Sequence, residues 1–156
     1  MRPLRRIIVH HSESPGGDAA MIREWHTTPS ETDPTKPWSD IGYHYVITNG
    51  KPHGDYSAGR DGEVQPGRRL RVQGAHAGGH NRDSIGVCLI GCFNEARPTH
   101  RQTRSLMELC LRLCERWGIP HSEVYGHRDV NATNCPGDNL FTQLPFVRTW
   151  LKWRMR

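Results

Sequence analysis

The sequence has no long apolar run, and no stretch approaches the roughly 20 residues that a membrane-spanning helix needs. Its N-terminal residues, Met1 to Arg6, are basic but have no apolar core and no small-residue cleavage site. We therefore expect no signal peptide, and a protein that stays in the cytoplasm of the cell that makes it. Internal repeats and linkers are also missing. A chain of 156 residues without them predicts one compact domain, residues 1–156.

Acidic residues are fewer than basic ones, so the formal net charge is +5. This balance favours polyanionic surroundings such as nucleic acid, anionic cell-wall polymers or membrane surfaces, and charge alone does not choose among them. The cations are scattered along the chain, and no nucleic-acid-binding motif is present. We therefore expect no nucleic-acid partner.

The five cysteines cannot all pair, and four of them are spaced four residues apart: Cys88 with Cys92, and Cys110 with Cys114. On a helix this spacing keeps two side chains on one face but too far apart for an easy disulfide. We expect these four to be small buried hydrophobic residues in a reducing compartment.

Apolar periodicity predicts strands interleaved with helices, and hence an α/β fold with a mixed central sheet flanked by helices. A β-branched first strand ends at His10 and His11, and further strands are predicted at 41–48, 63–65, 84–90 and 124–126. Helices are predicted at 19–26, 99–117 and 141–156. The proline-containing stretch 27–39 is a long connection, and loops of that length are often functional, so we expect it to form one rim of a groove.

A histidine and a cysteine stand at the two ends of a short turn-rich loop after the last predicted strand. His127 and Cys135 are separated by 135 − 127 = 8 positions. A loop of that length can bring an imidazole nitrogen and a thiolate to one point, which suits Zn²⁺ ligands at roughly 2.0–2.3 Å. The best candidate for a third ligand is a histidine at the end of the first strand. Because strands alternate sides, only one of His10 and His11 can face a given neighbour, and we favour His10.

These residues belong to an ordered series of motifs. It consists of His10, Gly42-Tyr43-His44-Tyr45, Gly74-Ala75-His76-Ala77, Asn81 with Ser84-Ile85-Gly86-Val87, Gly126-His127 and Cys135-Pro136-Gly137. The series resembles the zinc-dependent N-acetylmuramoyl-L-alanine amidases, a family that joins phage amidase lysins to animal peptidoglycan-recognition proteins. The resemblance covers a core of about residues 7–146 and implies the fold of that family. It also implies one Zn²⁺ held by His10, His127 and Cys135, with a fourth position open to water.

The resemblance implies catalytic roles for two further residues. Tyr43 would orient the attacking water or help to take its proton, although an inward-facing strand aromatic is the alternative. Thr133 stands where phage relatives often have lysine and recognition proteins often have threonine, and its hydroxyl would donate to the developing oxyanion. Another branch of the family has a glutamate where this chain has Cys88, so a carboxylate base is missing from that place.

Three residues resemble substrate contacts in the groove of the family: His76, Asn81 and Arg68. Each has an ordinary structural alternative. His76 could be a turn histidine bonded to its own backbone, Asn81 a side chain that fixes a loop, and Arg68 a solvated surface arginine. The basic end from Trp150 to Arg156 is expected to be the last helix, and binding of anionic envelope surfaces by this end is the sharper alternative.

The resemblance predicts a zinc hydrolase that cleaves the amide bond between N-acetylmuramic acid and L-alanine in peptidoglycan. We expect a monomeric phage or prophage endolysin that depends on a membrane-permeabilising holin to reach the cell wall. The alternatives are a non-catalytic peptidoglycan-binding module and a cytoplasmic amidase that recycles soluble muropeptides. The joint presence of His10, His127 and Cys135 argues against the binding module.

Overall fold

The computed structural model describes residues 1–156. It contains five strands, four α-helices and three short 3-10 helices. In chain order these are β1 (Arg6–His11), α1 (Ala19–Thr27), β2 (Tyr45–Asn49), η1 (Ala58–Arg60), β3 (Asp61–Pro66), β4 (Ser84–Leu89), α2 (His100–Trp117), η2 (His121–Glu123), β5 (Val124–Gly126), η3 (His127–Asp129), α3 (Asp138–Phe141) and α4 (Leu144–Arg154).

The strands form one mixed sheet in the order β3-β2-β4-β1-β5. β1 is parallel to both β4 and β5, β2 is parallel to β4, and only β3 is antiparallel to its neighbour β2. β4 is buried along its whole length, as its nearly continuous apolar sequence predicts. The chain is thus a single α/β domain with a mixed central sheet flanked by helices, and the predicted fold class is confirmed.

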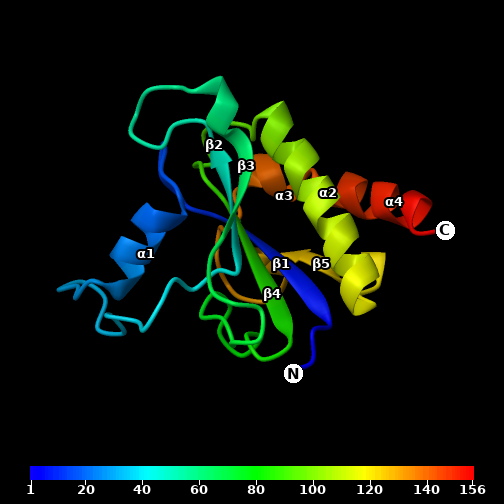
Figure 1. The fold of residues 1–156 in the computed structure, drawn as a ribbon, viewed down its shortest axis with the longest axis horizontal. Helices are drawn as coiled ribbons and strands as arrows, with labels where there is room; N and C mark the ends of the chain where they lie inside the picture. Colours follow the sequence, from blue (N-terminus) through cyan, green and yellow to red (C-terminus); the bar gives the residue numbers. More distant parts are fainter.

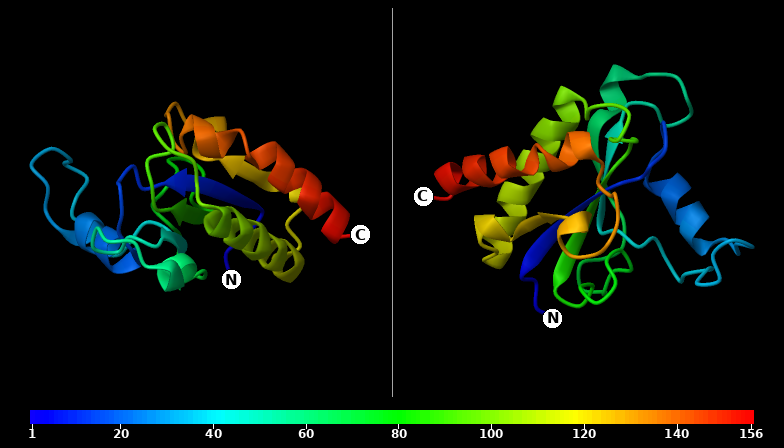
Figure 2. Two further views of the ribbon diagram at one scale, coloured as in Figure 1. Left: turned by 90° about the horizontal axis from the view of Figure 1, so that it is seen from above. Right: turned by 180° about the vertical axis from the view of Figure 1, so that it is seen from behind.

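Helices α2 and α4 cover one face of the sheet, and α1 lies on the other (Figure 1 and Figure 2). Side chains of β1 alternate between the two faces, as strand geometry requires. Ile7 and Val9 join the large core under α2 and α4. Ile8 and His10 point to the side of α1, where Ala19 and Ile22 of that helix pack on Cys88 and Val46 of the sheet.

The ends of α2 are those that its sequence predicts. Thr99 accepts a hydrogen bond from Gln102 N, and the Gln102 side chain bonds back to the Thr99 backbone, which completes a capping box. Gly118 ends the helix in the left-handed conformation, at φ 66°. Cys110 and Cys114 lie in the buried stripe, and both are free thiols, as expected for small hydrophobic residues.

Two predicted elements differ from the structure. The predicted strand at 41–48 begins only at Tyr45, because residues 42–44 bond to a separate segment of the chain: Ala75 N donates to Gly42 O, Arg68 N to Tyr43 O, and Gly67 N to His44 O. The last helix, predicted at 141–156, begins only at Leu144 as α4, with Pro145 in its first turn, and the short helix α3 before it was not predicted. None of the helices combines the length and the apolar character that crossing a bilayer requires.

Candidate functional site

The site is built where β1 ends at its carboxyl edge. His10 pairs with Cys88 of β4 and is only 1% exposed, on the face of the sheet that carries α1. His11 turns the other way, and its Nδ1 accepts a hydrogen bond from Phe93 N. The alternation of the strand therefore turns His10, and not His11, toward the site.

The loop that follows β5 brings two more side chains to this edge. His127 begins the short helix η3, and Arg128 N donates to the carbonyl of Cys135, which folds residue 135 back toward the start of the loop. Gly126 N is capped by the carboxylate of Asp129 at 2.9 Å. These bonds fix both ends of the loop without using the side chain of His127 or of Cys135.

His10, His127 and Cys135 converge, because one ligand atom from each lies within 4.8 Å of the others. His10 Nδ1 is 3.6 Å from Cys135 Sγ. Two ligands at 2.0 and 2.3 Å from a tetrahedral zinc ion are about 3.5 Å apart, so the nitrogen and the sulfur are spaced as such an ion requires. Two imidazoles and one thiolate are also a donor set that zinc prefers, and the residues present fit this metal.

A chain of hydrogen bonds fixes which nitrogen of His10 faces the site. The Ser84 hydroxyl donates to the carbonyl of His80 at 2.7 Å, so its oxygen is free to accept from His76 Nε2 at 3.3 Å. His76 Nδ1 is then an acceptor, and it lies 2.9 Å from His10 Nε2. His10 therefore carries its proton on Nε2, and the lone pair of Nδ1 points toward Cys135.

His127 is held in the same tautomer by a different residue. Its Nε2 lies 3.1 Å from Asn131 Oδ1, an oxygen that can only accept. The amide orientation of Asn131 is supported by its nitrogen, which donates to the carbonyl of Gly78 at 3.1 Å. Both histidines thus use Nε2 for an outer partner and leave Nδ1 for the site, an arrangement common among metal-bound histidines.

Burial sets the protonation of this cluster. It lowers the pKa of His10 and His76 well below the ordinary histidine value, and lowers that of His127 to a smaller extent. Neutral imidazoles, the form that binds metals, therefore prevail at neutral pH. Burial also raises the pKa of the metal-free Cys135 thiol to about 12.

Gly86 of β4 makes the room for His76. A Cβ at position 86 would lie 2.5 Å from His76 Cδ2, a contact too close for any side chain. The His76 ring therefore packs directly against the strand backbone, next to the end of β1.

Tyr43 lies beside this cluster, with its ring centroid 5.0 Å from that of His10. Burial, and then the neighbouring thiols of Cys88 and Cys135, raise the pKa of Tyr43 well above the ordinary tyrosine value. Its hydroxyl is therefore protonated and can donate. The oxygen of Thr133 accepts from Cys135 N at 3.2 Å, so its own O–H remains available to the groove.

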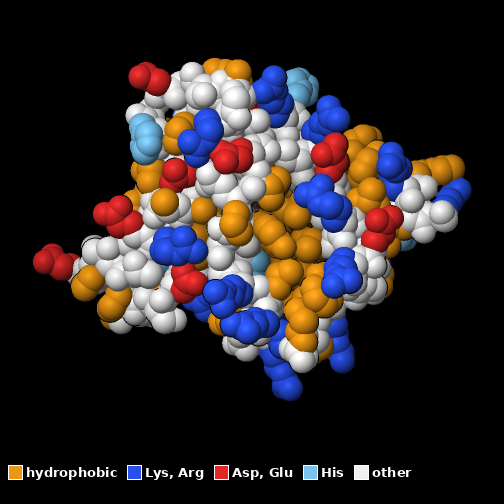
Figure 3. Space-filling model, in the orientation of Figure 1, with side chains coloured by type: hydrophobic (Ala, Val, Ile, Leu, Met, Phe, Trp, Pro, Cys, Tyr) orange, Lys and Arg blue, Asp and Glu red, His pale blue; other side chains and the backbone are white.

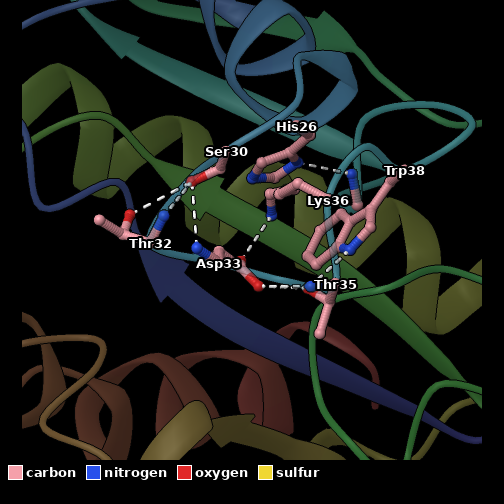
Figure 4. A network of polar contacts seen from close by, with 8 residues as sticks. His26, Ser30, Thr32, Asp33, Thr35, Lys36 and Trp38 are labelled. Atoms are coloured by element: carbon pink, nitrogen blue, oxygen red, sulfur yellow. Dashed lines mark hydrogen bonds and ion pairs between the residues drawn. The ribbon is translucent and has the colours of Figure 1, made fainter.

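These residues line one open groove of about 720 Å³. The connection between α1 and β2 supplies one wall through Thr35 and Trp38, so the prediction that it forms a rim is confirmed. Figure 4 shows why this proline-containing loop keeps a defined shape. Lys36 lies 3.3 Å from the centre of the Trp38 ring and pairs with Asp33, and the centres of the His26 and Trp38 rings are 4.6 Å apart.

The three predicted substrate contacts lie in different surroundings. His76 and Asn81 line the groove, but His76 is only 8% exposed and bonds to His10. Asn81 Oδ1 accepts from the backbone N–H groups of His76 and Ala77, so it fixes this loop while its amide nitrogen stays free. Arg68 is not among the groove residues, and its guanidinium donates to the carbonyls of Ile41, Gln73 and Asp40.

Sequence reasoning missed three residues of the site. Ser84 contacts His76, which is eight positions away in the sequence, and no spacing indicated that contact. Asn131 contacts His127, and its position four residues after that histidine is the one signal that could have identified it. Glu13 is the only Asp, Glu, Lys or Arg side chain that lines the groove, and the only non-glycine residue with positive φ, at 56°. Residues with such unusual backbone angles concentrate at functional sites, but no sequence motif predicts the positive φ of Glu13.

Comparison with known proteins gives consistent results. The family described as N-acetylmuramoyl-L-alanine amidase matches residues 1–138. Peptidoglycan-recognition protein SC2 of Drosophila melanogaster is 36% identical over 118 residues, which cover 75% of this chain and 56% of that protein. The endolysin of Enterobacteria phage T3 is 34% identical over 124 residues, 76% of this chain and 69% of that one. The chain therefore spans only about half the length of the recognition protein that it matches.

Among solved structures, the N-acetylmuramoyl-L-alanine amidase LysC from Clostridium intestinale URNW superimposes with a TM-score of 0.75. The match covers 99% of this chain and 86% of that one, at 28% sequence identity. The fold is thus shared along nearly the whole chain.

Proposed function

The chain belongs to the N-acetylmuramoyl-L-alanine amidase family, and on this basis we propose that it is a zinc-dependent hydrolase of the amide bond between N-acetylmuramic acid and L-alanine in peptidoglycan. The observation that carries the proposal is the convergence of His10, His127 and Cys135 at one end of an open groove. A zinc ion held there would polarise the scissile carbonyl and make water acidic enough to lose a proton near neutral pH.

The side chains around the three ligands take complementary roles in the proposed reaction. The protonated hydroxyl of Tyr43 donates a hydrogen bond at the reacting centre and orients the attacking water. The hydroxyl of Thr133, at the mouth of the groove, donates to the oxygen on which negative charge develops. Thr133 carries no charge, so its contribution is smaller than a lysine would give.

His76 positions a ligand in this proposal and does not contact the substrate. Its bond to His10 Nε2 and its small exposure support this role. Asn81 holds the His76 loop with its oxygen and turns its amide nitrogen toward the groove, where it would bind a carbonyl of the substrate. Arg68 keeps a structural role, because backbone carbonyls occupy its guanidinium.

The phage T3 endolysin among the relatives supports an endolysin as the biological setting. In that setting the protein would act on the host wall after a holin has opened the membrane. Recycling of soluble muropeptides is the alternative setting for the same chemistry.

The test compares metal content and the release of new L-alanine amino termini from purified sacculi for the wild type and Cys135→Ala. Cys92→Ala is the matched control, because Cys92 is also a partly exposed free thiol but does not line the groove. We expect zinc and L-alanine release in the wild type and the control, and neither in Cys135→Ala. Tight binding of sacculi without zinc or cleavage in the wild type would instead identify a recognition module.

A further inference from the structure

The positive charge of the protein is concentrated at one end. Six arginines lie at or next to the N-terminal ends of β1 and β4, and we call this group the arginine pole: Arg2, Arg5, Arg6, Arg69, Arg71 and Arg82. Arg69 and Arg71 flank Leu70, whose carbonyl accepts a hydrogen bond from Arg2. Two carboxylates lie close by: Asp83 pairs with Arg6, and Glu123 precedes β5 beside Arg6. Figure 3 shows blue side chains at the lower end of the molecule, where Figure 1 places the N-terminus. The chain has 21 basic and 16 acidic residues, so its formal net charge is +5. The pole sets six arginines against the two carboxylates Asp83 and Glu123, so its own net charge is strongly positive.

Two of the six arginines are structural. The guanidinium of Arg2 donates to the carbonyls of Leu70 and Ser84, at 2.8 and 3.0 Å, and to those of the loop residues 81 and 82. It thereby ties the segment around residue 70 to the 81–82 loop. Arg6 pairs with Asp83 at 3.2 Å.

The other four arginines are available to a ligand. Arg5, Arg69, Arg71 and Arg82 are all exposed, none of them forms a salt bridge, and none uses its side chain in a hydrogen bond. Their planar guanidinium groups can each bind a carboxylate or phosphate through two parallel hydrogen bonds.

The arginine pole begins where the groove ends. Gly78 and Asn81 line the groove, and their neighbours Gly79 and His80 line a second hollow of about 460 Å³ together with residues 5, 6 and 82. Apart from Pro3, the side chains that line this hollow are polar or charged, and Asp83 is its one carboxylate. A chain-like ligand that leaves the groove past the 78–81 loop therefore meets free guanidinium groups.

We propose that the arginine pole binds the carboxylates of stem peptides next to the one being cleaved, so that the protein prefers polymeric peptidoglycan to single muropeptides. The inference rests on the proposed function of the groove. Each stem peptide carries free carboxylates, so a glycan strand presents them repeatedly near the scissile bond. Exposed ion pairs are individually weak. Several of them reinforce one another only on a ligand that is already held in the groove.

The experiment compares two variants that each lack four positive charges, one with the charges removed from the pole and one with them removed from elsewhere on the surface. The pole variant is Arg5→Gln, Arg69→Gln, Arg71→Gln and Arg82→Gln. The control variant is Arg97→Gln, Lys152→Gln, Arg154→Gln and Arg156→Gln, four exposed cations outside the pole with the same total charge. Binding to purified sacculi is measured by sedimentation between about 50 and about 300 mM salt, and turnover is measured on a soluble monomeric muropeptide.

We expect the pole variant to bind sacculi about tenfold more weakly at low salt and with less salt dependence. The control variant should bind like the wild type, and both should turn over the soluble fragment within about twofold of it. Amidation of the sacculus carboxylates should abolish the difference between the wild type and the pole variant. Equal losses in both variants would overturn the proposal, as would a difference that survives amidation. A pole variant that loses affinity for duplex DNA or anionic vesicles but not for sacculi would also overturn it.

Sacculus binding does not require hydrolysis, so the same measurement on a Cys135→Ala background separates the two proposals. If sacculus binding depended on the pole but the wild type had no amidase activity, the proposed function would be refuted and the inference about binding by the pole would stand. Amidase activity with binding that ignores the pole would refute only the inference about the pole.

Discussion

The two faces of the sheet differ in what they bury. The face under α2 and α4 carries a continuous core of 18 buried residues, all of them apolar side chains or thiols. The face under α1 has a cluster of only six, and beyond it the sheet is covered by histidines and the loops of the groove. One face therefore supplies most of the hydrophobic stabilisation, which leaves the other free to hold a polar site that contributes little of it. Substitutions on the two faces should accordingly have separate effects.

The largest effect that leaves the fold intact is expected from Tyr43→Phe on the groove face. Removing the hydroxyl should lower kcat/KM for L-alanine release by about 10² to 10⁴-fold, the range for a general acid–base group. Zinc content and the free energy of unfolding should not change. Tyr56→Phe, which removes an exposed hydroxyl bonded to Asp61, is the control. Full activity of Tyr43→Phe would remove Tyr43 from the mechanism.

Leu106→Ala tests the opposite face. Leu106 is fully buried in α2, so the substitution should lower the free energy of unfolding by about 2–5 kcal/mol in urea titrations. Zinc bound per folded molecule should stay the same. Leu111→Ala, on a partly exposed position of the same helix, should cost less. If Leu106→Ala released zinc from protein that remains folded, the two faces would be coupled.

His76→Ala should weaken zinc binding by about 10 to 100-fold, as measured by competition with a chelator, because it removes the acceptor that orients His10. His76→Asn is the matched variant, since the amide oxygen can take the place of Nδ1 and accept from His10. We expect it to retain most of the affinity. A raised KM with unchanged zinc affinity in both variants would make His76 a substrate contact instead.

The smallest effect is expected at the cap of α2. Thr99→Ala removes the side chain that accepts from Gln102 N and also donates to Asp61, and should lower the free energy of unfolding by about 1 kcal/mol. Activity per folded molecule should be unchanged. Thr142→Ala, which removes an exposed side chain without hydrogen bonds, should have no effect. An equal loss in both variants would show that the cap contributes nothing specific.

Short sequence patterns predicted those helices and strands whose formation depends on residues close together in the chain. The capping residues of α2, the β-branched β1 and the buried β4 follow from residues close to one another in the sequence. The residues at 42–44 do not, because their backbone-to-backbone hydrogen bonds go to partners more than 20 positions away. Alternation along β1 separates His10 from His11, and His10 is the one that lies with His127 and Cys135.

The sequence identified residues that converge at the candidate site, but not the surroundings of those residues. Motif order identified His10, His127 and Cys135, whose convergence the structure supports. It gave no indication that His76 bonds to His10, or that Ser84 and Asn131 fix the tautomers of the two histidines. Those bonds depend on ring orientation and on the space left by Gly86, which no spacing in the sequence records.

The distance along the chain between the ligands has a consequence for the lifetime of the protein. His10 and Cys135 are 125 positions apart, so the unfolded chain has no comparable site, and a metal at this site would bind the native state. A native-state ligand at 100 times its dissociation constant raises the free energy of unfolding by about 2.7 kcal/mol. If zinc is the ligand, its free concentration sets the melting temperature as well as the activity. A chelator would then shorten the survival of the protein against proteases, and metal-rich surroundings would prolong it.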